Sequence, residues 1–300
     1  MFFATRVSLF YIVCVVFAAY LSLIERKLIA KIQLRVGPNH CGPCGVLQPA
    51  ADAIKLLFKQ HPFKNQAKHT IFAVCLYMAA TLVQMTLIPM PWNSFSPRCG
   101  LLLVILTQSL IAFSEILIGS TSGSKYGRIG GNRAYLQTVG AHIPLILSVM
   151  AVMVLTKELK IAPAGGLMWT IKTIPLTIMF FISLLMASSR IPFDFVEAES
   201  ELVAGAYVEC GGILFAMIHL ADYLNLTFIS ALTASVFFGG CKVWHTALHA
   251  YTSLLLETLG IICFVVFMRA ILPRYQQDQM NEIAWLYISP LLLGCIFFFL

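Results

Sequence analysis

Long apolar runs recur along this chain and are separated by shorter segments that carry most of the charge. A hydrocarbon core about 30 Å thick is crossed by about 20 apolar residues in a helix. Eight runs have this character, and they cover residues 3–24, 70–90, 100–119, 134–156, 168–187, 206–239, 250–271 and 283–300. We therefore predict an all-α, polytopic membrane protein with about eight transmembrane helices, in which residues 1–300 form a single membrane domain.

The composition supports membrane insertion of the whole chain. Of the 300 residues, 59% are hydrophobic and only 11% are charged, which is outside the range of soluble domains. The first apolar run ends at Glu25-Arg26-Lys27 and not at a small-residue cleavage site, so we expect it to be a retained span. The sixth run, 206–239, exceeds one perpendicular crossing and must tilt, project or break, for instance near Gly211-Gly212.

Lys and Arg residues are divided unevenly between the two sets of connecting segments. Most of the 20 follow the first, third, fifth and seventh runs. Positive residues favour the inner side of a membrane, so we place these loops in the cytoplasm or the mitochondrial matrix. The net charge of +7 then reflects topology, and nucleic acid is not expected as a partner.

The first inner loop contains a short amphipathic pattern over residues 48–60. Ala51, Ile54, Leu57 and Phe58 fall on one helical stripe, and the charged residues fall on other faces. We predict a surface helix that lies along the membrane, with an ordinary solvated connector as the alternative.

Acidic residues gather in the fifth-to-sixth connection and also occur inside the apolar runs. Ionisable groups within a span are costly unless they face a polar interior, so they are candidates for function. Carboxylates that lie close together in a poorly solvated site cannot all ionise, which would couple their protonation. The connection holds Asp194, Glu197, Glu199, Glu201 and Glu209, and the predicted spans hold Glu115, His142, Glu209, Asp222 and Glu257.

The tetrapeptide Cys41-Gly42-Pro43-Cys44 has the spacing of a thioredoxin-type redox site. That chemistry places the first thiol at a helix N-terminus beside a βαβ sheet, whereas this motif lies in a Gly- and Pro-rich loop between two membrane-associated helices. The context favours a structural loop.

Two further patterns fall short of a defined site. His245 and His249 are four residues apart, but a lone His pair is not a zinc site. Gly127, Gly130 and Gly131 follow no strand and precede no GxxxxGK pattern, so a phosphate cradle is not expected. These glycines are more typical of a tight turn.

Two inner loops carry motifs that are specific when taken together. The first reads Glu25-Arg26-Lys27, then Gln33 to Asn39, then Leu47 to Lys55, and the second reads Arg190 to Asp194, then Glu197 to Glu209. With the eight predicted spans, they resemble subunit 1 of respiratory complex I, the NADH:ubiquinone oxidoreductase. Matches at Tyr126 to Thr138 and at Arg269 to Gln279 extend the resemblance over nearly the whole chain.

The resemblance implies a core membrane subunit of a proton-pumping enzyme, with no redox centre, catalytic residue or metal ligand in this chain. It would form much of the quinone-access tunnel and couple quinone reduction to proton translocation. The residues that line or shape the tunnel would be Arg26, Gln33, Arg35, Asp52 and Arg274. The coupling path would include Glu25, Glu115, His142, Asp194, Glu197, Glu199, Glu201, Glu209 and Asp222.

The same resemblance implies the surroundings of the chain. Ubiquinone would be its substrate, and lipids, other membrane subunits and peripheral quinone-module subunits would be its partners. Flavin and iron–sulfur clusters would lie in those partner subunits, where NADH is oxidised. We expect a mitochondrially encoded, multi-pass protein of the mitochondrial inner membrane, with the bacterial plasma membrane as the alternative.

The chain departs from the family pattern at several acidic positions. His142 and Ala187 stand where the family usually has glutamates, and Asp222 replaces a third. Glu115 adds an acid on the third predicted span. We hypothesise that His142 and Glu115 partly restore a titratable path, because His changes charge near neutral pH.

Other functions remain as alternatives. A membrane anchor of a related energy-converting hydrogenase or ferredoxin-linked complex would share parts of the same loops. A quinone-linked thiol oxidoreductase would use Cys41 and Cys44, although topology places them on the reducing inner side. An independent ion transporter has only the buried charges in its favour.

Overall fold

The computed structural model describes residues 2–59, 67–89, 97–161, 173–197, 199–239 and 247–299. Regular structure in these ranges is helical, without a strand, and seven helices are long and apolar enough to cross a membrane. The prediction of an all-α polytopic membrane protein is therefore confirmed. The seven helical stretches are α1 (Phe2–Ile32), α3 (Ala67–Met85), α4 (Gly100–Thr121), α5 (Lys125–Thr156), α8 (Ile213–Thr233), α9 (Ala247–Ile271), and α10 (Gln277–Glu282) continued by a π-helical segment and α11 (Ser289–Phe299).

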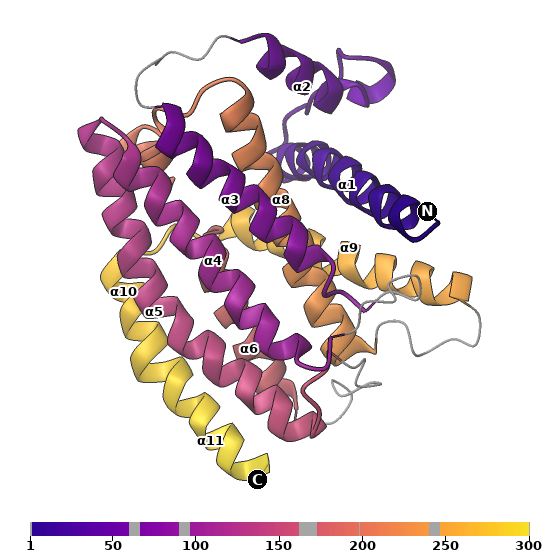
Figure 1. Cartoon of the computed structure of the whole chain (residues 1–300), viewed down its shortest axis with the longest axis vertical. Coiled ribbons are helices and arrows are strands. Elements are labelled where there is room, and N and C mark those ends of the chain that lie inside the picture. Colours follow the sequence, from indigo (N-terminus) through magenta and orange to yellow (C-terminus); the bar gives the residue numbers. More distant parts are fainter. Residues whose placement is uncertain are drawn as a thin grey trace.

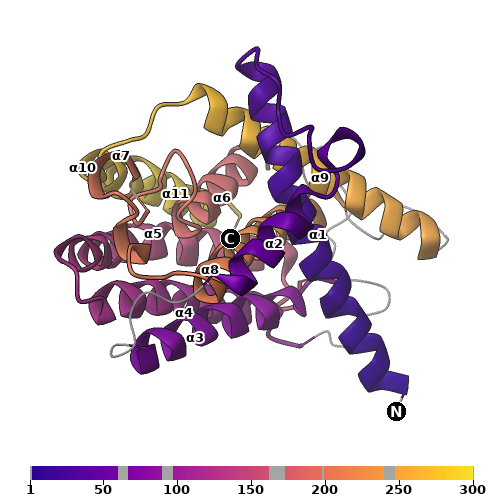
Figure 2. The same cartoon turned by 90° about the horizontal axis from the view of Figure 1, so that it is seen from above.

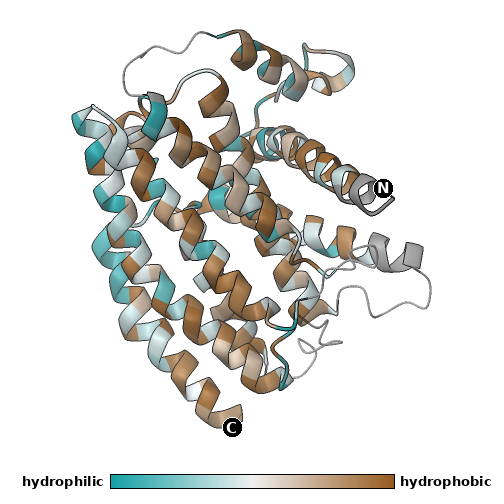
Figure 3. Ribbon diagram, in the orientation of Figure 1, coloured by the Kyte–Doolittle hydropathy of each residue, from teal (hydrophilic) through white to brown (hydrophobic). Residues whose placement is uncertain are grey.

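The helices form a bundle from which two members diverge. Helices α3, α4, α5 and α11 lie as a tilted row, and α6 and α8 pack behind them (Figure 1). Helices α1 and α9 contact α8 and extend away from one side of the bundle (Figure 2). Apolar residues dominate the bundle, and polar residues are frequent at the end where α5 begins (Figure 3).

The predicted fifth span is represented by a shorter helix. Helix α6 (Ile174–Ala187) has 14 residues, fewer than a perpendicular crossing requires. Residues 162–172, which cover the start of the predicted span 168–187, lie outside the described ranges. Helix α6 ends immediately before the acidic connection and so positions that connection at the end of the bundle.

The predicted sixth span is broken near the glycine pair. A 3₁₀ turn covers Gly205–Tyr207, and α8 begins only after Gly212, whose φ of 58° favours glycine. A side chain at Gly212 would also meet the Lys59 carbonyl at the end of α2. Glu209 therefore precedes the helix, and its assignment to the interior of a span was wrong.

Several helices extend further toward the inner loops than the apolar runs indicated. Helix α1 continues to Ile32 and therefore carries Glu25 and Arg26. Helix α5 begins at Lys125, where the Ser124 hydroxyl caps it by accepting a hydrogen bond from Gly127 N at 3.0 Å. The apolar runs underestimate the lengths of these helices, because the residues at the helix ends are polar.

Helix α2 (Gln48–Phe58) confirms the helix predicted over residues 48–60. None of its side chains is buried, and Phe58 is 85% exposed. Figure 1 shows α2 beyond the end of the bundle, where it contacts α1 and α8. Its exposed apolar residues, Ile54, Leu57 and Phe58, are suited to contact with lipid.

The glycines at the start of α5 allow close helix packing. Gly127, Gly130 and Gly131 are helical, so the prediction of a tight turn was wrong. A Cβ on Gly119 would meet the Cα of Gly131, and one on Gly130 would meet the backbone of Ala206. Small residues at such positions let two helices approach closely in a membrane.

This packing predicts a difference between two Gly→Ala variants. Gly119→Ala should destabilise the protein by about 1–3 kcal/mol, because the added methyl group overpacks the α4–α5 contact. Gly260→Ala is the matched control, since a Cβ there has nothing within 4 Å. Thermal unfolding in detergent would compare them, and equal midpoints would contradict the close contact.

Candidate functional site

Several ionisable residues lie around Arg190. We use the name charge cluster for Arg190 together with Glu25, Tyr77, Glu115, Asp222 and Arg269. The guanidinium carbon of Arg190 is 4.8 Å from the centre of the Tyr223 ring. Burial alone would lower the pKa of Arg190, but the carboxylates of Asp222 and Glu25 raise it above its usual value. Arg190 therefore stays positively charged and attracts the negatively charged carboxylates near the end of α6.

The second part of the charge cluster joins α1 to α9. Glu25 on α1 is 5% exposed and forms an ion pair with Arg269 in the last turn of α9. Removal of Arg269 would leave the buried Glu25 carboxylate without this partner. The pair therefore fixes the inner end of α1 against the end of α9.

The third part of the charge cluster lies between α3, α4 and α8. The Tyr77 hydroxyl donates a hydrogen bond to Asp222 and also lies near the Glu115 carboxylate. The Ser189 hydroxyl donates to Glu115 Oε2 at 3.2 Å. Two carboxylates, predicted separately from sequence, thus share one buried site that touches the start of the acidic connection.

Tyr207, from the 3₁₀ turn of that connection, covers this carboxylate pair and is 5% exposed. Burial, followed by the charges of Glu115 and Asp222, raises the pKa of Tyr207 well above its usual value. Tyr207 therefore stays neutral and cannot supply a second negative charge.

The five acids of the connection do not converge on a single point. The Asp194 carboxylate accepts from Glu197 N at 3.3 Å, and burial raises the pKa of Asp194 although Arg274 opposes this shift. Glu209 Oε2 accepts from Gly123 N at 2.8 Å. Glu201 forms a surface ion pair with Arg133.

Glu199 begins the short helix α7 (Glu199–Leu202), and its side chain lies outside the described set. Ser189 and Arg190 at the start of the connection, and Tyr207 in its 3₁₀ turn, lie close to the carboxylates of the charge cluster. The connection therefore combines a buried beginning with an ion pair at the surface.

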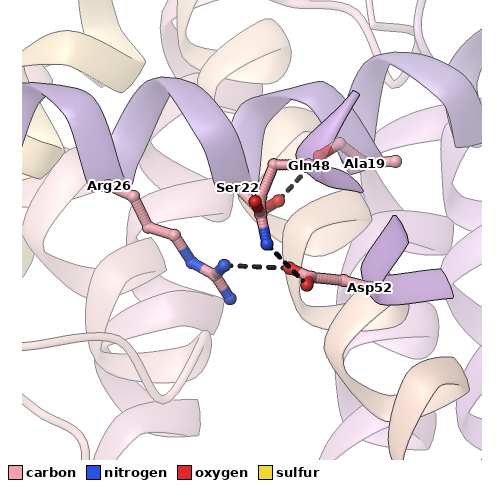
Figure 4. A network of polar contacts seen from close by, with 5 residues as sticks. All are labelled: Ala19, Ser22, Arg26, Gln48 and Asp52. Atoms are coloured by element: carbon pink, nitrogen blue, oxygen red, sulfur yellow. Dashed lines mark hydrogen bonds and ion pairs between the residues drawn. The ribbon is translucent and has the colours of Figure 1, made fainter. Parts of the chain in front are cut away.

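A second polar group joins α1 to α2. Arg26 Nη1 donates to Asp52 Oδ2 at 2.9 Å, and Gln48 Nε2 donates to Asp52 Oδ1 at 2.9 Å. Figure 4 shows both donors directed at the same carboxylate, near the Ser22 hydroxyl, which donates to the Ala19 carbonyl at 2.7 Å. The Arg26 and Asp52 side chains are 56% and 37% exposed, so this group is open to a ligand or a partner.

The other predicted tunnel residues occupy two different places. Gln33 and Arg35 follow α1, where Arg35 Nε donates to Gln33 Oε1 at 2.8 Å in an exposed position. Arg274 instead lies beside the acidic connection, with its guanidinium carbon 5.9 Å from the centre of the Phe195 ring. Arg26 and Asp52 are thus brought together, but the five residues do not form a single contact group.

His142 forms a hydrogen bond within α5, between Nδ1 and the Thr138 carbonyl at 2.9 Å, and does not join the charge cluster. Ala187, which is 8% exposed, is the last residue of α6. Glu257 lies within α9. His245 and the side chain of His249 lie outside the described residues.

The loop predicted at the Cys-Gly-Pro-Cys motif is present and contains a single 3₁₀ turn, Pro43–Gly45. Cys41 and Cys44 are both free thiols. Lys27 on α1 donates to the Cys44 carbonyl, which ties the loop to the helix. These contacts give the motif a structural part in placing α2.

Sequence reasoning missed several members of the charge cluster and its surroundings. Arg190 and Arg269 stood in recognised motifs, and their position at the ends of apolar helices was a usable signal. Tyr77, Tyr223 and Ser189 gave no such signal, because their importance depends on which helices pack together. Their hydroxyl groups and rings became identifiable only from the packing.

The Arg133–Glu201 pair predicts a small, pH-dependent effect. Its hydrogen bond and the charge of Arg133 lower the pKa of Glu201, so the pair stabilises the protein above the ordinary Glu range of about 4.3 and loses this effect as pH falls through the lowered value. Because the Glu201 side chain is 54% exposed, Glu201→Gln should cost less than about 1 kcal/mol near neutral pH. Thermal unfolding at pH 7 and pH 3 would test this, and a larger loss at pH 3 would contradict it.

Comparison with known proteins places these features in one family. Residues 5–300 match the family model described as NADH dehydrogenase. An NADH-quinone oxidoreductase subunit of Orientia tsutsugamushi (strain Boryong) is 36% identical over 302 residues, covering 95% of this chain and 85% of the relative. NADH-ubiquinone oxidoreductase chain 1 is 37% identical in both Osphranter rufus, over 301 residues, and Monodelphis domestica, over 303 residues, with 97% of this chain and 94% of each relative covered.

These relatives extend over nearly the whole length of the chain, including every helix that contributes to the charge cluster. The chain therefore belongs to the family of complex I membrane subunits that comprises NADH-ubiquinone oxidoreductase chain 1 and the corresponding subunit of bacterial NADH-quinone oxidoreductase.

Proposed function

We propose that this subunit forms much of the quinone-access tunnel of a proton-pumping NADH:ubiquinone oxidoreductase and couples quinone reduction to proton translocation. The observation that carries the proposal is the charge cluster, which joins α1, α3, α4, α8 and α9 to the acidic connection. Buried ionisable groups in a membrane protein mark ion or proton pathways. In this proposal the tunnel at the inner face meets the spanning helices at this cluster.

The quinone passage would begin near α2 and the inner end of α1. The exposed cation of Arg26 and the amide of Gln33 offer hydrogen-bond donors to the carbonyl oxygens of a quinone ring. The apolar side of α2 suits the isoprenoid tail. Arg35, Asp52 and Arg274 complete the proposed set, with Arg274 nearer to the acidic connection.

Coupling would depend on charge interactions within the cluster. Glu115, which is buried, lies close to Asp222, and neighbouring carboxylates are coupled in their protonation. A negative charge on the quinone during reduction would attract Arg190 and weaken its hold on Asp222 and Glu25. A proton could then be taken up by a carboxylate and released when the quinone charge is neutralised.

The remaining members of the proposed coupling path are Asp194, Glu197, Glu199, Glu201, Glu209 and His142. Asp194 is the best placed of these, because its carboxylate is largely buried and close to Arg274 and Arg190. Glu201 and Glu209 hold the connection to α5 and to Gly123, which assigns them the part of positioning it. His142 would act through α5 and not through direct contact with the carboxylate pair.

We further propose that the chain is a single membrane domain that assembles with other complex I membrane subunits, peripheral quinone-module subunits and lipid. Electrons would reach ubiquinone from flavin and iron–sulfur clusters in those subunits. The seven apolar helices and the bacterial and mammalian relatives support an energy-coupling membrane, for which we propose the mitochondrial inner membrane. Copurification with a flavin- and cluster-bearing NADH dehydrogenase arm would separate this function from that of a hydrogenase-linked anchor.

The Arg26–Asp52 contact supplies the direct test of the quinone passage. Asp52→Leu should reduce inhibitor-sensitive NADH:ubiquinone activity by up to about fivefold in kcat/KM, because an exposed ion pair contributes about 0.2–1 kcal/mol. NADH oxidation by a water-soluble acceptor at the flavin should not change. Asp278→Leu, on α10, is the matched control.

The proposal would be wrong if Asp52→Leu and Asp278→Leu retained the same ubiquinone activity in fully assembled complexes. Replacement of Cys41 and Cys44 by Ser tests the thiol oxidoreductase alternative. Ubiquinone reduction should persist in that variant if the proposed function is correct. Loss of ubiquinone reduction only in the cysteine variant would favour the thiol oxidoreductase.

A further inference from the structure

Three buried amides form a second polar layer in the helices that carry the Glu115–Asp222 pair. They are Gln84 on α3, Gln108 on α4 and Asn225 on α8, and we call them the amide layer. Their exposures are 0%, 0% and 2%, respectively. Gln108 Nε2 donates to Asn225 Oδ1 at 3.0 Å, which joins α4 to α8 inside the bundle.

Most of the polar atoms of the amide layer lack a partner. Among the described residues, no hydrogen bond reaches Gln84 Oε1, Gln84 Nε2, Gln108 Oε1 or Asn225 Nδ2. Buried polar groups in proteins are nearly always paired with protein or with ordered water. Four such atoms on three neighbouring helices are therefore suited to bind water, which needs two to four polar partners.

Helix registers place the amide layer deeper in the bundle than the carboxylates. Gln84 follows Tyr77 by seven residues, and Gln108 precedes Glu115 by seven, so each lies two turns away on the same helix face. Asn225 lies one turn beyond Asp222. Seven residues correspond to about 10 Å along a helix, which is about a third of the hydrocarbon thickness.

A separate contact confirms that α3 and α8 are level at this depth. The Thr227 hydroxyl lies 3.7 Å from Met85 Sδ, in hydrogen-bonding geometry. Gln84 and Asn225 are close neighbours of this contact in sequence. The amides of α3, α4 and α8 therefore occupy one layer, on the side of the carboxylates that faces away from the inner loops.

We propose that Gln84, Gln108 and Asn225 bind water inside the membrane and extend the path of protons from the Glu115–Asp222 pair toward the opposite membrane face. The proposal deepens the proposed coupling function and rests on it. Thr81, which is 0% exposed and one turn beyond Tyr77, offers a hydroxyl between the two layers on α3. Ile111 occupies the corresponding place on α4, so the connection follows α3.

The two layers would act differently on a proton. A carboxylate can hold a proton covalently, whereas a neutral amide only orients water by donating and accepting hydrogen bonds. A proton would leave a carboxylic acid, move along the bound water by exchange of O–H bonds and depart from the last water. No electron is transferred, and the amides are unchanged at the end.

The first test removes the water-binding amide from the assembled complex. Gln84→Leu should lose proton translocation per NADH oxidised in proteoliposomes, while ubiquinone reduction measured with an ionophore stays at the parent rate. Gln84→Asn should restore translocation, because it keeps an amide. Met85→Leu is the matched control for packing, since it changes the adjacent buried side chain without removing an amide.

Unchanged translocation in both Gln84→Leu and Gln108→Leu would overturn the inference. Failure of the proposed function is distinguishable, because it would appear as normal ubiquinone reduction in Asp52→Leu. If Gln84→Leu does not assemble, a structure of the parent complex that resolves ordered water decides the question. Water hydrogen-bonded to Gln84 would support the site, and a dry amide layer would overturn it.

Discussion

Arg190→Met should abolish inhibitor-sensitive NADH:ubiquinone activity and lower the amount of assembled complex. The substitution removes a cation that interacts with the carboxylates of Asp222 and Glu25, and only Glu25 retains its ion pair with Arg269. Leaving a buried carboxylate with less compensating positive charge costs up to about 3–5 kcal/mol, which is a large part of the stability of a domain. Native gel electrophoresis with in-gel activity would measure both effects.

Two further variants separate charge from packing at this position. Arg190→Lys keeps the cation but loses the planar stacking on Tyr223, so it should assemble and retain reduced activity. Arg128→Met makes the same change at an exposed arginine of the same inner side and should behave as the parent does. Full activity in Arg190→Met would show that Arg190 does not hold the cluster together.

Glu115→Leu should strongly reduce the number of protons translocated per NADH, whereas His142→Leu should reduce it much less. Glu115 accepts a hydrogen bond from Ser189 and lies close to Tyr77 and Asp222, so its replacement by Leu removes the carboxylate pair. His142 forms its hydrogen bond to Thr138 within α5, away from that pair. Acidification of proteoliposomes, normalised to NADH oxidation, would compare the two variants.

Glu115→Gln provides the control for this comparison. It preserves the hydrogen bond from Ser189 but cannot exchange a proton, so it should lose translocation as Glu115→Leu does while remaining better folded. Equal losses of proton translocation in His142→Leu and Glu115→Leu would indicate that His142 belongs to the same proton path as Glu115. Normal translocation in Glu115→Gln would exclude proton exchange at this carboxylate.

The positions of the membrane helices could be predicted from apolar runs, but their ends could not. Glu25 and Arg26 indicated the end of the first span, yet both belong to α1, because charged groups at a helix end can pair with neighbours or reach water. Gly211-Gly212 correctly marked a possible break before α8. The choice between a break and a tilt depended on the packing of Gly212 against α2, which has no local signal.

The candidate site, too, could be predicted from the sequence only in part. Glu115 and Asp222 were identifiable separately, because a carboxylate inside an apolar run needs a polar neighbour. Their pairing through Tyr77 depends on how α3, α4 and α8 pack, and a tyrosine in an apolar run has many ordinary uses. The predicted tunnel residues came from the family resemblance, and the structure adds which of them touch.

The position of α2 has a consequence for how quinone affinity should be measured. Its exposed Ile54, Leu57 and Phe58 suit an opening that faces the lipid. A long-tailed quinone dissolves almost entirely in the bilayer, so the enzyme would respond to its mole fraction among lipids and not to its aqueous concentration. Adding lipid to the membranes should then raise the apparent KM when it is expressed as total quinone concentration, although the protein itself is unaltered.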